Sequence, residues 1–450
     1  MVDFNVLFAH HSIGTGRDPY LDQRAFPLLW AGQAVSQFGS KVGRSAISFA
    51  AIATLGATPF QLAALGAVEH LSEITGAAIA TAVTDRTRRR PVMIAADAGR
   101  AVVTLAVPVL AFTAGLEFAH LVAVAALVGT LSVIFDVACG AYVPTIVPPE
   151  RLVVANSRLS AGASVAEVAG FGIAGWLVQW LTAPIAIAVD ALTFVVSAIS
   201  LWLIRTPEPL PVPHPAEGDQ GDVSVPGPTG WAARSRAAVR LGISDSRVGF
   251  TAIRSHPVLW GQFLAFLCDA VAGGIASVTI VLYMIRVVGF DPGVLTTIWA
   301  IGGVTSLGGA FIARRIVARL GAGPTMVLGL VGTGAGTLLI TAASAPDLAG
   351  AVFLVLNQLV VDPCATIYQI TADSLRQAIT PNHVLGRVGS ATRLATSIFT
   401  IAGMGLGGVI VETIGMGAGV AASGIGALLA AAILASGPAG RVGPITVEAD

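Results

Sequence analysis

The chain has 450 residues, of which 55% are hydrophobic and only 11% are charged, and its acidic and basic residues balance to zero net charge. Soluble domains carry about 25% charged residues, so this composition excludes an ordinary water-soluble protein and predicts a chain that lies in lipid. The zero net charge also argues against a nucleic-acid partner. The three cysteines lie in apolar runs without paired or metal-type spacing, so we expect no metal site and no cofactor.

Twelve apolar stretches follow a polar N-terminal tail, and each is long enough to cross the hydrocarbon core, which needs about 20 residues. The tail, residues 1–25, contains several charged residues and no apolar core of signal-peptide type. We therefore predict an all-α integral membrane protein whose first membrane helix starts its insertion. The predicted spans are 27–54, 61–83, 92–114, 119–144, 157–180, 184–204, 258–285, 293–315, 324–344, 348–372, 389–412 and 417–436.

These spans divide into two groups of six. We predict an N-terminal bundle over residues 26–204, a C-terminal bundle over 258–436 and a short C-terminal tail over 437–450. The linker between the bundles, 205–257, opens with a Pro/Gly-rich stretch, which favours a flexible connection. Its end is arginine-rich with interleaved apolar residues, which predicts a short helix lying on the membrane surface.

The arginines predict which way the chain faces. They gather in the loops after the second, fourth, sixth, eighth and tenth spans, whereas the alternate loops contain none, apart from Arg286 at the edge of one of them. Because positively charged loops stay in the cytoplasm, both termini are expected to be cytoplasmic. Arginine far outnumbers lysine and Ala and Gly are abundant, which favours a bacterial source, so we expect the protein in the bacterial inner membrane.

An internal repeat relates the two groups of spans. The segment "GAAIATAVTDRTRRRPVM" from Gly76 parallels "GAFIARRIVARLGAGPTM" from Gly309, and "GFGIAGWLV" from Gly170 parallels "GMGLGGVIV" from Gly403. Both matches imply one displacement of 233 residues. A shared displacement predicts two structural repeats of six helices.

With these features the chain resembles the major facilitator superfamily, and more narrowly its drug:proton antiporter branch with macrolide-efflux proteins and the enterobactin exporter. The segments that carry the resemblance are "LWAGQAVSQFGS", "TDRTRRRPVMIAADAGR", "VPTIVPPERLVVANS", "IRSHPVLWG" and "RQAITPNHVLGRVGS". The resemblance implies a major facilitator fold, a monomer, and transport by alternating access of a midplane site to the two sides.

In that family the basic loop after the second helix acts as a cytoplasmic latch, which closes the inner side in the outward-facing state. The alternative is that its arginines only anchor the topology. Asp97 and Arg100 are one helical turn apart, and a structural pair joined to the latch is favoured over a proton site. The residues assigned to the latch are Asp85, Arg86, Arg89, Arg90, Asp97 and Arg100.

The sequence departs from the family pattern at several positions. Thr81 and Arg88 replace glycines of the loop motif, and Ala318 replaces the aspartate of its second copy, so any latch is asymmetric. Phe171 replaces the proline of the antiporter motif. Small residues on one helix face allow close approach of neighbouring helices. The expected packing glycines are Gly162, Gly170, Gly175, Gly403 and Gly407.

Ionisable residues at membrane depth are costly and are candidates for function. Glu69 and Glu73 share a helix face, where mutual repulsion would favour a proton on one of them. The alternative is that one faces water while the other pairs with Lys41 or Arg44. The candidates for proton coupling are Asp136, Asp269, Glu69, Glu73, Glu167 and Asp362.

Two cations in the first span, Lys41 and Arg44, make a cationic substrate less expected than in the family. They favour an anionic or zwitterionic substrate, or else an internal ion pair. The residues expected along the substrate path are Lys41, Arg44, Phe38, Phe135, Phe266 and Tyr368.

Together these patterns predict a secondary active transporter for proton-coupled efflux of a small amphipathic compound, such as a drug, a macrolide or a siderophore-like molecule. Uptake of a small solute and a non-transporting receptor remain alternatives. The cytoplasmic segments show no nucleotide-binding loop, metal-ligand cluster or Ser/His/Asp arrangement, so no enzyme is expected.

Overall fold

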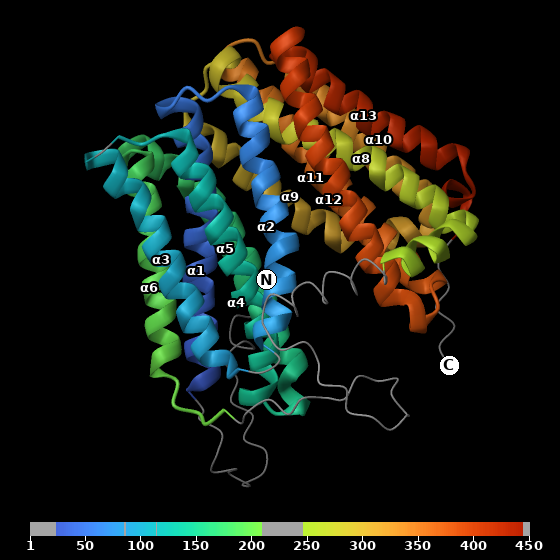
Figure 1. Cartoon of the computed structure of the whole chain (residues 1–450). Helices are drawn as coiled ribbons and strands as arrows, with labels where there is room; N and C mark the ends of the chain where they lie inside the picture. The colour runs from blue at the N-terminus through green and yellow to red at the C-terminus, as the bar shows by residue number, and fades with distance from the viewer. Residues whose placement is uncertain (1–23, 85–86, 114, 209–245, 444–450) are drawn as a thin grey trace, which may run out of the picture.

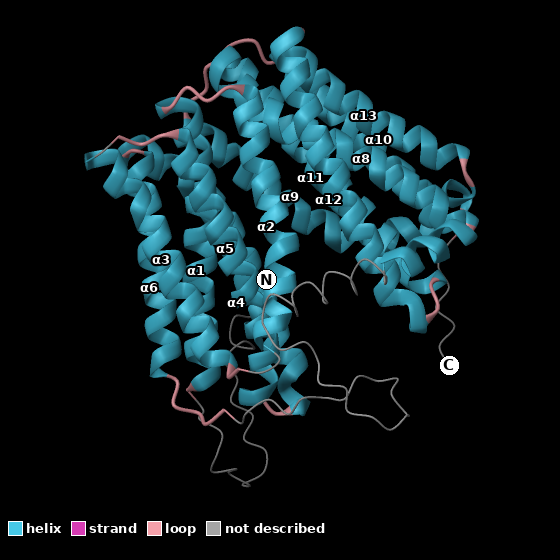
Figure 2. Cartoon of the chain, in the orientation of Figure 1, coloured by secondary structure: helices cyan, strands magenta, loops and turns pink. Residues whose placement is uncertain are grey.

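The computed structural model describes residues 24–84, 87–113, 115–208 and 246–443, and within these ranges it contains helices and no strand (Figure 2). The N-terminal bundle consists of α1 (Ala25–Phe49) with a π-helical turn η2 (Ala50–Thr54), α2 (Pro59–Thr84), α3 (Arg89–Thr113), α4 (Phe118–Ile146), α5 (Leu152–Leu181) and α6 (Ala183–Leu203).

The C-terminal bundle repeats this arrangement. It consists of α8 (Pro257–Leu282) with a π-helical turn η4 (Tyr283–Val288), α9 (Pro292–Leu320), α10 (Ala322–Leu339), α11 (Leu348–Ile379), α12 (Asn382–Thr413) and α13 (Met416–Ser436). A short helix over residues 246–255 precedes α8. Its Ile253 is buried beside α8 and α12, so the helix predicted at the end of the linker is present.

Ten helices of the described chain are long and apolar enough to cross a membrane, and α1 and α2 are not among them. All twelve predicted spans coincide with helices, but several helices are longer than predicted. α12 begins at Asn382 rather than 389, and α11 ends at Ile379 rather than 372. These extra turns are polar and extend beyond the apolar stretch, so hydropathy alone does not detect them.

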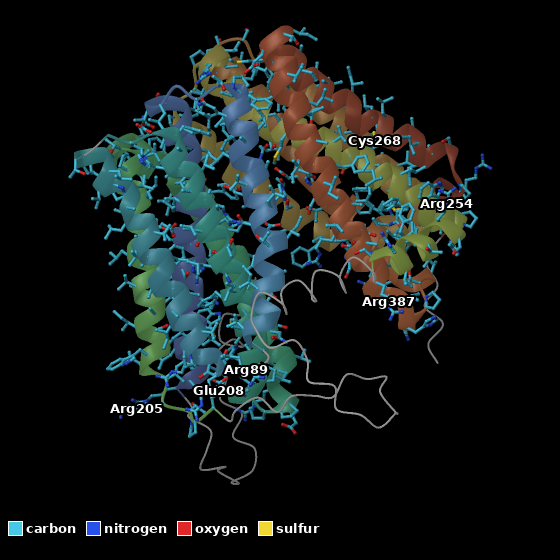
Figure 3. All side chains as sticks on the ribbon, in the orientation of Figure 1. Arg89, Arg205, Glu208, Arg254, Cys268 and Arg387 are labelled. Atoms are coloured by element: carbon cyan, nitrogen blue, oxygen red, sulfur yellow. The ribbon has the colours of Figure 1, made fainter. Side chains whose placement is uncertain are left out.

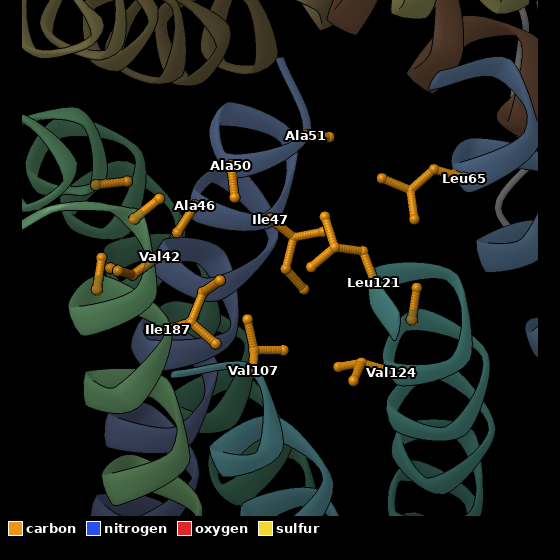
Figure 4. Close-up of a cluster of buried hydrophobic side chains, with 14 of the residues drawn as sticks. Val42, Ala46, Ile47, Ala50, Ala51, Leu65, Val107, Leu121, Val124 and Ile187 are labelled. Carbon is orange, nitrogen blue, oxygen red and sulfur yellow. The ribbon is translucent and has the colours of Figure 1, made fainter. Parts of the chain in front are cut away.

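Small residues set the distances between helices, as is typical where lipid rather than water surrounds the protein. On α1, Gly39 lies against Thr193 of α6, and Gly43 lies against the carboxyl group of Asp190. A buried apolar cluster, which includes Val42 and Ile187, fills the space between α1, α3, α4 and α6 (Figure 4).

The two bundles converge at one end and diverge at the other (Figure 1). The end at which they diverge carries the arginine clusters, including Arg89, Arg205 and Arg387 (Figure 3), and we call it the arginine-rich end. The opposite, arginine-poor end holds the inter-bundle hydrogen bonds of the described chain. There Trp176 of α5 donates to Thr297 of α9 (2.8 Å), and Gln179 accepts from the backbone of Gly293 (3.2 Å).

The repeat extends to local backbone geometry. The π-helical turns η2 and η4 begin at Ala50 and Tyr283, and each turn is followed by a glycine with positive φ, Gly56 (+62°) and Gly289 (+87°). Both pairs are separated by the displacement of 233 residues found in the sequence. Positive φ is a conformation that glycine adopts without strain, which explains why both copies keep it.

The region expected to be a C-terminal tail partly docks on the C-terminal bundle. After the turn η6 (Pro438–Arg441), the carbonyls of Val442 and Gly443 accept hydrogen bonds from the backbone of Gly323 (2.9 Å) and Ala322 (3.0 Å). The first amides of a helix have no partner within it, so this segment caps the start of α10. Residues 444–450 lie outside the described part of the chain.

Candidate functional site

A cavity of about 530 Å³ lies between the two bundles, where α5 faces α9 and α11. Its lining is mixed: carboxylates and other polar groups alternate with aromatic and aliphatic side chains. The lining residues are Ser164, Glu167, Val168, Phe171, Trp299, Ala300, Gly303, Ser306, Leu307, Gln358 and Asp362. A cavity of this size, with a few polar groups in an apolar wall, can hold a small organic molecule.

Glu167 contributes the carboxylate of the N-terminal bundle. It forms an ion pair with Lys41 of α1, whose ammonium group also lies 5.3 Å from the centre of the Phe171 ring. Lys41 is therefore neutralised within its own bundle, which is the internal ion pair that the sequence left as an alternative. Arg44, the second cation of this span, is exposed and does not line the cavity.

Asp362 contributes the carboxylate of the C-terminal bundle. It accepts a hydrogen bond from the amide of Gln358 (2.8 Å) and packs against Gly302 of α9, where a larger residue would collide with the carboxyl group. Within the described residues no arginine, lysine or histidine forms an ion pair with Asp362. One of the two cavity carboxylates is therefore paired and the other lacks a cation.

A second charged group lies inside the N-terminal bundle. Arg100 is 4% exposed and forms an ion pair with Asp97, while its guanidinium group lies between the rings of Phe135 (4.5 Å) and Phe194 (4.4 Å). Ser132 accepts a further hydrogen bond from it (3.3 Å). Phe135 therefore packs in the bundle core against Arg100 and does not line the cavity.

Arg44 is the centre of an acidic neighbourhood on the same bundle. Its charge acts on the carboxyl groups of Glu69, Asp136 and Asp190. Asp136 is exposed, whereas Asp190 is buried against α1. Glu73 is exposed and lies near His70 (3.8 Å), so Glu69 and Glu73 adopt the second arrangement that the sequence left open.

In the C-terminal bundle, Asp269 of α8 is half-buried beside Phe266 and Tyr368. The rings of Phe266 and Tyr368 lie 5.5 Å apart in the core of the bundle, so neither residue lines the cavity. Within the described residues Asp269 makes no ion pair. Phe38 is half-buried and packs against the apolar cluster of α1.

The latch loop is described only in part, because Asp85 and Arg86 lie outside the described residues. The backbone amides of Arg89 and Arg90 donate to the carboxylate of Glu208 (2.6 and 3.1 Å), which follows α6. Arg90 in turn donates to the carbonyls at the end of α6, Leu201 (2.8 Å) and Trp202 (2.6 Å). Figure 3 shows Arg89 and Glu208 together at the arginine-rich end of the N-terminal bundle.

The five packing glycines each lie at a close helix crossing. Gly162 and Gly170 of α5 meet α1, at Trp30 and Lys41. Gly175 of α5 meets the backbone of Pro292 in α9, across the boundary between the bundles. Gly403 and Gly407 of α12 meet the backbone of α8.

Sequence reasoning missed three residues of this arrangement. Glu208 was assigned to a flexible linker, although a lone acid next to an arginine-rich loop was a usable signal. Gln358 is an uncharged neighbour of a membrane acid, which a search for charges passes over. Asp190 was given a low rank, yet it is 4% exposed in the middle of α6. In the described residues no three His, Cys, Asp or Glu side chains gather to hold a metal ion.

Two six-helix bundles related by an internal repeat, with a polar cavity between them, define the architecture of a secondary transporter. The model of the Major Facilitator Superfamily matches residues 29–393, and the chain belongs to that family. A search of curated proteins finds no match.

Solved transporters share this fold. A bacterial homologue of the iron transporter ferroportin in its inward-facing state is 17% identical, with a TM-score of 0.66 over 92% of this chain and 98% of that one. A POT family transporter in complex with 5-aminolevulinic acid is 12% identical, with a TM-score of 0.68 over 92% and 96%. The nucleoside transporter NupG is 12% identical, with a TM-score of 0.67 over 92% and 98%. At these identities the likeness establishes the fold alone.

Proposed function

We propose that the protein exports a small amphipathic compound with a cationic amine, driven by protons, through alternating access of the cavity between its bundles. The observation that carries this proposal is the pair of cavity carboxylates, Glu167 with its own cation and Asp362 without one. A carboxylate at membrane depth needs a counter-charge or a proton. A bound ammonium group would supply that charge to Asp362, with Trp299 and Phe171 offering faces for the apolar body.

The proposal revises the substrate charge that the sequence favoured. Two cations in the first span suggested an anionic or zwitterionic compound. The ion pair with Glu167 removes Lys41 from that reckoning, and Arg44 lies among acids. What the cavity then offers to a ligand is net negative charge.

We further propose that the arginine-rich end faces the cytoplasm, so that both termini are cytoplasmic and all twelve long helices span a bacterial inner membrane. The positive-inside rule supports this orientation. In that orientation the structure has the form of an inward-facing state, because the inter-bundle hydrogen bonds described lie at the opposite end. The protein would work as a monomer.

For the coupling ion we propose protons. The carboxyls assigned to carry them are Asp136, Glu69 and Glu73 around Arg44, Asp269 in the other bundle, and Glu167 and Asp362 in the cavity. The position of Asp136 supports its role: it is exposed in this state and feels the charges of both Arg44 and Arg100. A group placed between two cations can exchange its proton as the bundles move.

The latch proposal also stands. The bonds of Arg89 and Arg90 to Glu208 and α6 stay within the N-terminal bundle in this state, which is what an open inner side requires of a latch. Asp85 and Arg86 would bind the other bundle only when that side closes. Asp85→Asn should then shift the resting population further towards the inward-facing form.

The test uses purified protein in liposomes with a trapped pH dye. A panel of cationic dyes, macrolides, siderophores and neutral sugars is added as a gradient, and proton movement is recorded. Movement with cationic amphiphiles, lost in Asp362→Asn and kept in the surface variant Asp373→Asn, supports the proposal. Proton movement in the same direction as the solute would establish uptake instead.

Silence with every compound, from folded protein that still binds one of them, would favour a receptor without transport. The carboxylate variants assign the coupling. Asp136→Asn and Asp269→Asn should abolish proton-driven movement if those acids carry the proton, and unchanged kinetics in both would remove them from the mechanism.

A further inference from the structure

The ends of α1 and α8 share a rare backbone form at the arginine-poor end. Each helix closes in a π-helical turn, η2 and η4, followed by a glycine with positive φ. π-helical turns are uncommon and often occur at functional positions. Because both copies keep the turn and the glycine at the repeat displacement, this geometry belongs to the architecture of the two bundles.

Arg286 of η4 reaches from one turn to the other. Its Nη2 donates to the carbonyl of Ala57 (2.8 Å) and approaches the carbonyl of Ile52 in η2 (3.5 Å). The last carbonyls of a helix have no backbone donor of their own, so these acceptors are available to an external cation. The repeat counterpart of Arg286 is Ala53, so the contact is built from one side only.

The surroundings make these two contacts matter. Ile52 and Ala63 of the N-terminal bundle pack with Val278, Leu282 and Met404 of the C-terminal bundle into one buried cluster. Within the described residues no carboxylate pairs with Arg286. The guanidinium group therefore depends on main-chain carbonyls, and hydrogen bonds from a charged donor are stronger than neutral ones.

The position of this arginine also calls for a local cause. Arginine is otherwise absent from the loops of this end, which are the loops expected outside the cell. A cation placed there against the topological pattern, and bonded to the opposite bundle, has a role in joining the bundles rather than in setting topology.

We infer that Arg286 is a clasp that holds the arginine-poor end closed and is released when that end opens. The two carbonyl contacts join η4 to η2 only while the bundles converge there. When the bundles separate, the guanidinium loses both acceptors, and the difference in energy favours the closed end. This inference concerns the conformational cycle and does not depend on which compound is carried.

The test measures distances between spin labels in liposomes, in a variant whose three native cysteines are replaced by alanine. Labels at Thr113 and Ser344 report on the arginine-poor end, and labels at Val153 and Gln377 report on the arginine-rich end. Arg286→Ala should lengthen the first distance and shorten the second, with the open population rising about tenfold or more. Arg319→Ala, at the opposite end, is the matched control and should change neither distance.

A transfer of the clasp gives a sharper test. Adding Ala53→Arg to Arg286→Ala places the cation on the other turn, opposite the counterpart carbonyls of Ile285 and Phe290, and should restore the wild-type distances. If Arg286→Ala does not fold, Arg286→Gln, which has no charge and is too short to reach both carbonyls, gives the same readout. Wild-type distances in either folded variant would overturn the inference.

Discussion

The carboxylate of Glu208, 2.6 Å from the backbone amide of Arg89, caps the start of α3 from a position just after α6. In the second repeat the carbonyls of Val442 and Gly443 cap the start of α10 in the same way. The capped positions, Arg89 and Ala322, are separated by the repeat displacement of 233 residues. In both bundles, therefore, the chain after the sixth helix closes the start of the third, with a charged group in one copy and a neutral one in the other.

Removing this cap should loosen the start of α3. A carboxylate at a helix N-terminus is stabilised by the unpaired amides and the helix dipole, so Glu208→Ala should cost about 1–2 kcal/mol of stability. We expect faster hydrogen exchange over the first turn of α3 and a lower melting temperature in detergent. Glu412→Ala, an exposed acid at the end of α12, serves as the control. Equal exchange rates in the two variants would contradict the cap.

The buried pair of Asp97 and Arg100 should be critical for folding. Asp97→Asn leaves a charged guanidinium in the core of the bundle, and breaking a buried pair from one side costs about 3–5 kcal/mol. Thermal unfolding should show a large drop for this variant. The half-exposed pair of Asp373 and Arg376 is the matched comparison, since Asp373→Asn should cost less than about 1 kcal/mol. Similar drops for both would mean that burial does not set the cost.

The ion pair of Lys41 and Glu167 is tested by a double-mutant cycle. The side chains are 22% and 50% exposed, so their coupling should be about 1 kcal/mol or less. Glu167→Gln alone frees a cation beside the cavity and should weaken binding of a cationic compound, measured by tryptophan fluorescence. Adding Lys41→Met should recover part of that loss. Additive effects of the two substitutions would show that the residues act independently.

The crossing of α5 and α9 should tolerate no side chain at Gly175. A Cβ at this position would collide with the backbone of Pro292 and with Thr296 of the other bundle. Gly175→Ala should therefore push the bundles apart at the arginine-poor end and weaken cross-linking between cysteines introduced at Gln179 and Gly293. Gly308→Ala on α9, where a Cβ meets open space, should leave cross-linking unchanged.

Much of the fold could be predicted from the sequence because its strongest signals are long. Apolar stretches of about 20 residues mark the helices, and two matching segments at one displacement mark the repeat. The errors lie at helix ends such as Asn382, where polar turns continue a helix without an apolar signal.

The candidate site was harder to predict, for a physical reason. Sequence identifies charges at membrane depth, but their meaning depends on what lies across a helix boundary. Lys41 changes from a substrate contact to a neutralised residue once Glu167, far away in the sequence, is beside it. Phe135 is a cavity wall by composition and a support for Arg100 by packing. Such partners are fixed by tertiary contact and have no local pattern.

The constant displacement between the repeats has a consequence for the history of the protein. From the π-helical turns to the caps of α3 and α10, the two copies have kept one length, so their differences arose by substitution and not by insertion or deletion. Arg286 opposite Ala53, and Arg100 opposite Thr333, are therefore records of how a symmetric ancestor divided its labour. Reverting such positions pairwise is a route to rebuilding that ancestor one property at a time.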